Sequence, residues 1–165
     1  MNYYTVYQCP FSKIYLKSDG LVLTGLYFEQ TKNFEKIFKD CKFSNSDIFN
    51  STIKWLDLYF SGQIPSFTPE YKIENATPFR LEVIDIMSQI PYGKLVTYND
   101  ISKQIAKDYG IKKMSAQAVG GAVGWNPICI IIPCHRVVGS NNSLTGYTGG
   151  VENKIKLLEI EGHTF

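Results

Sequence analysis

The chain has 165 residues, 44% of them apolar, and its 17 basic and 15 acidic side chains give a formal net charge of +2. This length fits one large domain or two small ones with a packed core. So small a charge does not by itself indicate a nucleic-acid binder, and no apolar stretch approaches the roughly 20 residues that a membrane-spanning helix needs. Residues 1–76 carry eight basic and eight acidic side chains, and residues 77–165 carry nine and seven. The whole surplus therefore lies in the second half, where it is compatible with DNA binding without requiring it.

Three strands and one helix are predicted in the first part of the chain. Short apolar segments bounded by turn signals predict strands over residues 3–7, 12–17 and 21–28, with a hairpin turn at 18–20. Apolar residues at helical spacing predict a helix over residues 46–60.

A stretch rich in glycine, proline and serine, residues 61–69, cannot continue that helix. We place a domain boundary near residues 72–77, so that the predicted domains are residues 1–74 and 75–165.

The second domain is predicted to be mainly helical. Thr77 is a candidate N-cap with a proline at the first helical position, and an apolar stripe runs from there to Ile90. Thr97 and Asp100 form a candidate capping box for a second helix, and Ser115 can cap a third. Two short helices joined by a turn form a helix-turn-helix arrangement.

Two more elements are predicted at the end of the chain. Residues 139–146 form a polar, turn-rich loop that suits the wing of a winged-helix domain. A last helix is predicted from about Val151 to Glu161, with Val151, Ile155 and Leu158 on its inner face.

The four cysteines, Cys9, Cys41, Cys129 and Cys134, show neither a CxxC pair nor the spacing of a disulfide framework. The first residues lack the basic start and apolar run of a secretory signal peptide. We therefore expect a soluble, cytoplasmic protein with reduced thiols.

The sequence Pro-Cys-His-Arg at 133–136 is the strongest candidate for chemistry. Cys134 ends an apolar segment, residues 127–133, that is typical of a buried strand and would hold a nucleophile at the rim of a core. A buried structural cysteine is the ordinary alternative. Cys134 differs from that case because the adjacent His135 and Arg136 favour a thiolate. Adjacent side chains of an extended chain point to opposite faces, so a direct Cys134–His135 contact needs a turn or a bridging water.

The flanking segments extend this pattern. Gly120-Gly-Ala-Val-Gly-Trp-Asn-Pro127 precedes it and Gly146-Tyr-Thr-Gly-Gly150 follows it. Together these segments resemble the active-site region of the O6-alkylguanine-DNA alkyltransferases, which are single-turnover DNA repair proteins. The resemblance implies an α/β protein with an N-terminal ribonuclease H-like domain, made of a small sheet and a helix. It also implies a C-terminal winged helix-turn-helix domain that docks in the minor groove.

The resemblance implies a role for each matching residue. Cys134 would accept the alkyl group of O6-methylguanine in double-stranded DNA, irreversibly and without a cofactor. His135 would act as the base through a water molecule, and Glu161 would orient it. Tyr98 would help to turn the base out of the duplex, and the Asn126 side chain would tie its turn to the active-site segment.

The other candidate site residues form two sets, and a monomer is expected. The substrate pocket would be lined by Val137, Tyr147 and Thr148, and also by Trp125, for which a place in the core is the alternative. The DNA contacts would be made by Tyr98, Ser115, Gln117, Ala118, Gly121 and Arg136.

The helix that would face DNA has two unusual features, a pair of glycines and Gln117. Gly120 and Gly121 each weaken a helix by roughly 1 kcal/mol relative to alanine, so we expect close packing or close approach of a nucleic acid there. Gln117 stands where the family usually has an arginine that enters the base stack. A glutamine fills that space without a charge, so weaker or less salt-sensitive DNA binding is expected.

Other readings of the sequence remain open. Some relatives hold a structural zinc through N-terminal cysteines and histidines, but no histidine precedes His135 here, so no metal is expected. A non-catalytic, alkyltransferase-like lesion binder is the main alternative function, which Gln117 favours and Cys134 opposes. A thiol hydrolase would also need an oxyanion hole, for which the sequence gives no sign.

Overall fold

The computed structural model describes residues 1–144 and 146–165, so that residue 145 of the predicted wing lies outside the described part. The chain forms two compact units, Met1–Glu74 with Pro127–Cys129, and Asn75–Asn126 with Ile130–Phe165. Among the described residues, no helix combines the length and apolar character needed to cross a membrane.

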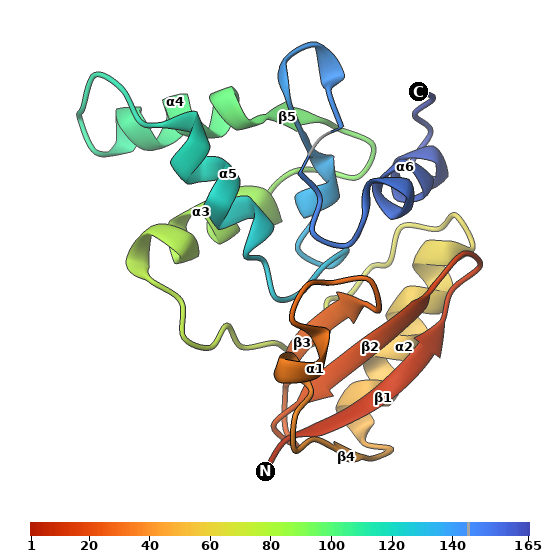
Figure 1. Cartoon of the computed structure of the whole chain (residues 1–165). Coiled ribbons are helices and arrows are strands. Elements are labelled where there is room, and N and C mark those ends of the chain that lie inside the picture. The colour runs from red at the N-terminus through yellow and green to blue at the C-terminus, as the bar shows by residue number, and fades with distance from the viewer. Residues whose placement is uncertain (145) are drawn as a thin grey trace. The chain divides into compact units, whose positions relative to one another are not determined.

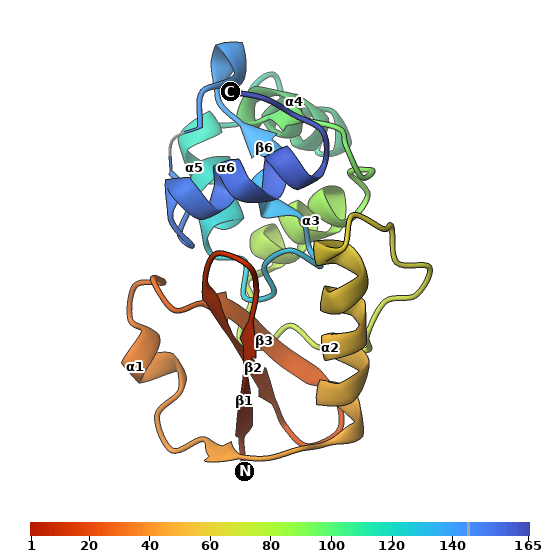
Figure 2. The same cartoon turned by 90° about the vertical axis from the view of Figure 1, so that its right-hand side faces the viewer.

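The first unit is a four-stranded sheet with one long helix on one face. Its strands are β1 (Tyr3–Gln8), β2 (Lys13–Ser18), β3 (Leu23–Phe28) and β4 (Lys42–Phe43), in the spatial order β3-β2-β1-β4. β2 is antiparallel to both of its neighbours, and β4 is parallel to β1. The helix α2 (Asp47–Phe60) lies on one face of this sheet, and the one-turn helix α1 (Phe34–Ile37) lies on the other (Figures 1 and 2).

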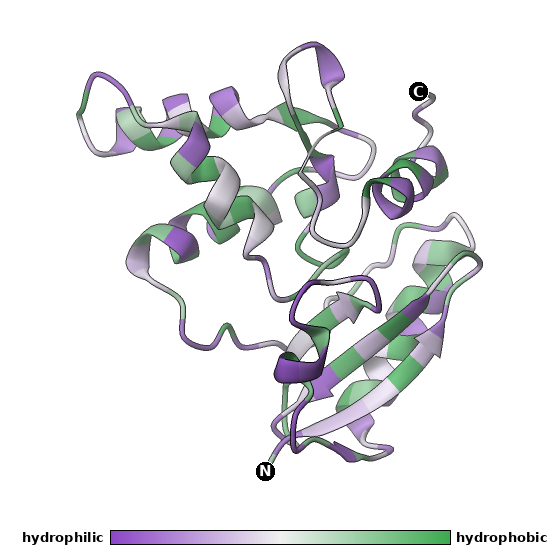
Figure 3. Ribbon diagram, in the orientation of Figure 1, coloured by the Kyte–Doolittle hydropathy of each residue, from purple (hydrophilic) through white to green (hydrophobic). Residues whose placement is uncertain are grey.

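The three predicted strands and the predicted helix of this unit are confirmed, whereas α1 and β4 were not predicted. Hydrophobic and polar residues alternate along β2 (Figure 3), and its inward residues Ile14 and Leu16 are fully buried. The third strand begins at Leu23 instead of residue 21. The Asp19 carboxylate accepts hydrogen bonds from the backbone N–H groups of the two residues before Leu23, at 2.9 and 3.0 Å, and so keeps them in the turn.

In its described residues, the second unit has four α-helices and a short parallel strand pair (Figures 1 and 2). Its α-helices are α3 (Pro78–Ser88), α4 (Tyr98–Asp108), α5 (Ala116–Gly124) and α6 (Val151–Ile160). Two 3₁₀ turns, η1 (Cys134–Arg136) and η2 (Ser140–Asn142), flank the strand β6 (Val137–Val138), which pairs with β5 (Val96–Thr97). The pair β5–β6 was not predicted, because two-residue strands carry no recognisable alternation.

The predicted starts of α3, α4 and α5 are confirmed by their caps. The Thr77 hydroxyl accepts a hydrogen bond from the third backbone N–H beyond it, and Ser115 does the same at the start of α5. Thr97 and Asp100 form the predicted capping box, with reciprocal hydrogen bonds of 2.9 and 3.0 Å. These contacts satisfy N–H groups that have no partner within the helix, so they fix where each helix begins.

The segment before Cys134 is a turn, so the prediction of a buried strand over residues 127–133 was wrong. Only Ile128 forms a strand-like bridge, with Leu26 of β3. Ile130 has φ +70°, a left-handed conformation in which a β-branched side chain is strained. The chain thus turns back through Ile130 and enters the Cys134 turn from a compact loop.

Candidate active site

Cys134 begins a 3₁₀ turn that is fixed from both sides. Its N–H donates to the carbonyl oxygen of Ile132 at 2.8 Å, across Pro133 with φ −82° and ψ 65°. These angles define an inverse γ-turn, the tightest backbone reversal available. Since Cys134 and His135 are consecutive residues of a 3₁₀ turn, their side chains do not point to opposite faces as they would in a strand. Cys134 is buried, with 3% of its surface exposed.

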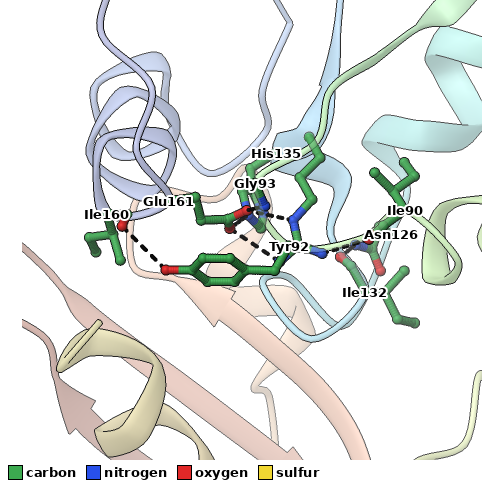
Figure 4. A network of polar contacts seen from close by, with 9 residues as sticks. Ile90, Tyr92, Gly93, Asn126, Ile132, His135, Ile160 and Glu161 are labelled. Atoms are coloured by element: carbon green, nitrogen blue, oxygen red, sulfur yellow. Dashed lines mark hydrogen bonds and ion pairs between the residues drawn. The ribbon is translucent and has the colours of Figure 1, made fainter. Parts of the chain in front are cut away.

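Asn126 holds the other end of this loop. Its side-chain amide donates to the carbonyl oxygen of Ile132 at 2.8 Å (Figure 4). The same carbonyl also accepts from the Cys134 N–H. Asn126 is 2% exposed, and an unsatisfied amide at this depth would destabilise the fold. The Asn126 side chain therefore joins the end of α5 to the segment that enters the Cys134 turn.

Glu161, directly after α6, is the centre of the polar network in Figure 4. Its carboxylate accepts hydrogen bonds from His135 Nε2 at 2.6 Å and from the backbone N–H of Gly93 at 2.9 Å. It also pairs with Arg136, whose Nε donates to Oε1 at 2.7 Å and whose Nη2 donates to Oε2 at 3.2 Å. A side chain that the sequence places 26 residues beyond His135 thus orients both basic residues of the turn.

The ionisation of this network follows from its burial. Burial alone would raise the pKa of Glu161, but the hydrogen bonds from His135, Arg136 and Gly93 outweigh it and hold that pKa well below its ordinary value. Burial lowers the pKa of His135, although Glu161 opposes this effect. The stable state at neutral pH is accordingly a Glu161 carboxylate beside a neutral imidazole. With the Nε2 proton directed to the carboxylate, the imidazole has its basic lone pair on Nδ1.

Arg136 was expected to contact DNA, but its side chain is directed into the protein. Arg136 is 8% exposed, and besides its ion pair with Glu161 it donates from Nη1 to the carbonyl oxygen of Ile90 at 2.7 Å. Its guanidinium also lies 5.6 Å from the centre of the Tyr92 ring. These contacts direct the side chain inward, so Arg136 is part of the support of His135.

Lys154 of α6 is a buried cation that the sequence did not single out. Its side chain is fully buried, and its ammonium donates to the carbonyl oxygen of Val137 at 2.6 Å. The signal was present, because Lys154 is spaced by three and four residues from Val151 and Leu158, two residues of the predicted inner stripe. That stripe was only partly right: Leu158 is buried, whereas Val151, at the helix start, is 42% exposed.

A pocket of about 430 Å³ opens where α4, α5 and the loop after β6 meet. Of the predicted site residues, Tyr98 and Gln117 line it. Its other lining residues are Asn99, Ala116, Gly120, Gly139, Ser140 and Gly146. Burial raises the pKa of the Tyr98 hydroxyl, and the negative charge of a Cys134 thiolate raises it further, so Tyr98 stays protonated and can donate a hydrogen bond at neutral pH.

The four residues expected to form the substrate pocket are not among this lining. Trp125 lies under the Arg80 guanidinium, which is 4.6 Å from the ring centre, and it is not among the residues that line this pocket. Val137 is buried in β6, and the buried Tyr147 ring lies 5.7 Å from the Lys154 ammonium. Thr148 is exposed and faces α5, where a Cβ added to Gly124 would lie 3.4 Å from its methyl group.

The exposed face of α5 carries the other predicted DNA contacts. Ser115, Gln117, Ala118 and Gly121 are all exposed. A Cβ added to Gly120 would lie 3.9 Å from the Tyr98 ring, and one added to Gly121 would meet no described atom within 4 Å. Packing among the described residues therefore does not require a glycine at position 121. The exposed face of α5 around Gly121 is accessible to a partner.

A buried thiol thus lies next to a carboxylate-paired histidine, in a unit whose helices α4 and α5 form a helix-turn-helix arrangement and border a pocket. Among the described residues, no cluster of three or more histidine, cysteine or acidic side chains could hold a metal ion. Residues 78–163 match the family described as 6-O-methylguanine DNA methyltransferase, DNA binding domain, and residues 2–71 match that family's ribonuclease-like domain. The chain belongs to the 6-O-methylguanine DNA methyltransferase family.

Individual relatives agree with this assignment. The methylated-DNA–protein-cysteine methyltransferase of Methanosarcina acetivorans is 36% identical over 97% of this chain and 98% of its own. That of Haemophilus influenzae is 35% identical over 96% of this chain and 86% of its own.

Solved structures match equally well. The O6-methylguanine methyltransferase of Mycobacterium tuberculosis superposes with a TM-score of 0.82 at 36% identity, over 98% of this chain and 93% of its own. The same organism's OGT in complex with DNA gives 0.83 at 34% identity, over 96% and 92% of the two chains. The expected fold, with an N-terminal ribonuclease-like region and a C-terminal DNA-binding region, is thereby confirmed.

Proposed function

We propose that this protein repairs alkylated DNA by direct reversal, as a methylated-DNA–protein-cysteine methyltransferase. It takes the alkyl group of O6-methylguanine in double-stranded DNA onto Cys134, once per molecule, after the base has been turned out through the minor groove. The observation that carries this proposal is the placement of Cys134 on a rigid turn next to the His135–Glu161 pair, within a member of this family. A retained cysteine and relatives named as methyltransferases favour transfer over non-catalytic lesion binding.

The roles follow from the geometry and the bonds that change. The Cys134 sulfur forms a bond to the alkyl carbon as the bond from that carbon to guanine O6 breaks. His135 accepts the thiol proton through a water molecule, and Glu161 keeps the imidazole in the tautomer that can accept it. The guanine anion that leaves takes up a proton or hydrogen bonds, for which the protonated Tyr98 hydroxyl beside the pocket is suited. The protein is itself the acceptor, so the reaction needs no cofactor.

The DNA partner would dock on the exposed face of α5. The small side chains there admit a close approach of the sugar-phosphate backbone, and the exposed Lys112 and Lys113 precede the N-cap Ser115. Minor-groove docking suits a repair protein that accepts many sequence contexts, because that groove carries little sequence information. Tyr147 and Thr148 would contact the extruded base after rearrangement of their loop.

We further infer a monomer that acts in the cytoplasm, with residues 1–74 and 75–165 as its two domains. One acceptor thiol per chain is sufficient for the reaction, so no second subunit is needed. A thiol can accept an alkyl group only while it is reduced, and the cytoplasm keeps thiols in that state.

Intact-protein mass spectrometry tests the function. Equimolar wild-type protein and a duplex with a single O6-methylguanine should give a mass gain of one CH₂ on Cys134, ending after one equivalent. Cys134→Ser should bind the same duplex without gaining mass. Lesion binding by the wild type without a mass gain would instead identify a non-catalytic lesion binder, and repeated turnover would identify a hydrolase.

Gln117→Arg is expected to tighten DNA binding and to make it more salt-dependent, because the side chain lines the pocket beside the proposed DNA face. A new phosphate contact makes the slope of log K against log salt more negative by about 0.9. Fluorescence anisotropy with a labelled duplex over a salt series measures this slope. Gln63→Arg, which adds the same charge to the first unit, is the matched control. If the two variants change affinity and slope equally, Gln117 is not the residue that enters the base stack.

A further inference from the structure

Lys154 is the one buried charged side chain of the site for which the proposed mechanism has no use. Its side chain is fully buried, and no carboxylate of the described residues forms an ion pair with it. Taking an ammonium out of water is strongly unfavourable unless an opposite charge or several hydrogen bonds compensate for it. Its hydrogen bond to the Val137 carbonyl is short, at 2.6 Å, but that acceptor is neutral. A negative charge that forms only in some states of the protein would offset this cost.

Cys134 is the group that can supply this charge. Val137 follows the Cys134 turn directly, so the Lys154 ammonium is bound to the same short segment that carries the thiol. Burial lowers the pKa of Lys154 to about 8, and the negative charge of a Cys134 thiolate acts in the opposite direction. Attraction between two groups is mutual, so an ammonium at this position stabilises the thiolate as much as the thiolate stabilises the ammonium.

The other charged and titratable groups around Cys134 do not serve this purpose. The charge of Arg136 is matched by Glu161 in an ion pair of 2.7 Å, and burial keeps His135 neutral. The Tyr98 hydroxyl is protonated, because its pKa is raised by burial and by the thiolate. Tyr147 presents its ring to Lys154, with 5.7 Å between the ammonium and the ring centre. Lys154 is thus the cation whose charge is not already matched by an acid of the site.

We propose that Lys154 is a positioning residue for the acceptor, whose buried ammonium holds the strand after the Cys134 turn and stabilises the Cys134 thiolate before alkyl transfer. This inference rests on the proposed function, since it concerns how the same thiol is made ready. Alkylation converts the thiolate to a neutral thioether and removes the negative charge that Lys154 offsets. Lys154 therefore stabilises the thiolate only in the unreacted protein.

The test is the pH dependence of Cys134 alkylation by iodoacetamide, which needs no DNA and reports thiolate formation directly. Peptide mass spectrometry after timed labelling separates Cys134 from the other three cysteines. In Lys154→Met the midpoint of the rate profile should move upward by about one pH unit, which corresponds to an approximately tenfold lower rate below the midpoint. In Lys154→Arg, which keeps the positive charge, the midpoint should lie closer to the wild-type value. Lys156→Met, a change of an exposed lysine two residues further on, should leave the profile unchanged.

A purely structural role for Lys154 predicts a different result. It would lower the melting temperature, or the rate at every pH, without moving the midpoint, and an unmoved midpoint in folded Lys154→Met would overturn the proposal. If Lys154→Met does not fold, the reciprocal measurement decides. Nitrogen-detected NMR of the Lys154 ammonium should show a lower pKa in Cys134→Ser than in the wild type, and equal values would be incompatible with the proposal. Neither measurement depends on alkyl transfer from DNA, so failure of the proposed function would be seen separately.

Discussion

Glu161→Gln is expected to slow alkyl transfer by about 10²- to 10⁴-fold, the range typical for loss of the carboxylate that orients a catalytic histidine. The carboxylate accepts the Nε2 proton of His135 and so leaves the lone pair on Nδ1. A glutamine can present its NH₂ group to the same nitrogen and stabilise the opposite tautomer, in which Nδ1 carries the proton and cannot act as a base. Single-turnover transfer from an O6-methylguanine duplex in excess measures the loss.

The same substitution should also lower the free energy of unfolding, by about 3–5 kcal/mol, because it leaves the Arg136 guanidinium buried without its carboxylate. The double variant Glu161→Gln/Arg136→Met separates the two effects. It removes the unmatched cation, so it should recover much of the stability in urea titrations while the transfer rate stays low. A rate that recovers together with stability would show that Glu161 acts through the fold alone.

The free energy of unfolding at low pH gives an independent check on Glu161. The folded-state pKa values of His135 and Glu161 both lie below their ordinary values, so the unfolded chain binds protons more readily than the folded one. Stability should therefore fall as the pH drops below the ordinary His value of 6.5, and fall further below the ordinary Glu value of 4.5. Since Gln does not titrate, the double variant should lack the second fall in stability, the one below pH 4.5. If that fall remains in the double variant, it belongs to other carboxyl groups.

The parts of this protein that could be predicted from sequence are those fixed by neighbours along the chain. The capping residues Thr77, Thr97 and Ser115 act on N–H groups within three residues, so the starts of their helices were predicted correctly. The nucleophile candidate was also local, because Cys134 differs from the other cysteines by its adjacent histidine and arginine.

The parts that could not be predicted depend on distant partners. The isoleucine-rich segment before Cys134 has the composition of a strand, and only tertiary contacts at both ends hold Ile130 in a left-handed conformation. Arginine usually lies at the surface. The burial of Arg136 depends on its ion pair with Glu161, a carboxylate 25 residues further along the chain. The contact between the Trp125 ring and the guanidinium of Arg80 in α3 was likewise not predicted.

Asn126→Ala should lower the transfer rate by roughly 10- to 100-fold, because a displacement of about 1 Å at a reacting atom can change rates by that factor. The Asn126 amide and the Cys134 N–H share the carbonyl oxygen of Ile132, so losing the first bond loosens the loop that fixes the second. The strained conformation of Ile130 within this loop favours its rearrangement once the Asn126 bond is gone. Single-turnover transfer gives the rate, and amide hydrogen exchange at Cys134 reports whether its backbone hydrogen bond opens more often.

A control variant separates a loss of stability from a displacement of the nucleophile. Asn153 is also buried, and its side-chain amide donates to the carbonyl oxygen of Gly149 at 2.7 Å, a bond of the same kind in the same unit that does not involve the Cys134 loop. Asn153→Ala and Asn126→Ala should each lower the free energy of unfolding by about 1–3 kcal/mol. The rate of transfer and the exchange at Cys134 should change far more in Asn126→Ala. Equal losses of rate at equal stability would mean that Asn126 supports the fold without positioning the nucleophile, and the rigidity of the Cys134 turn would then have to come from its γ-turn and the Lys154 bond.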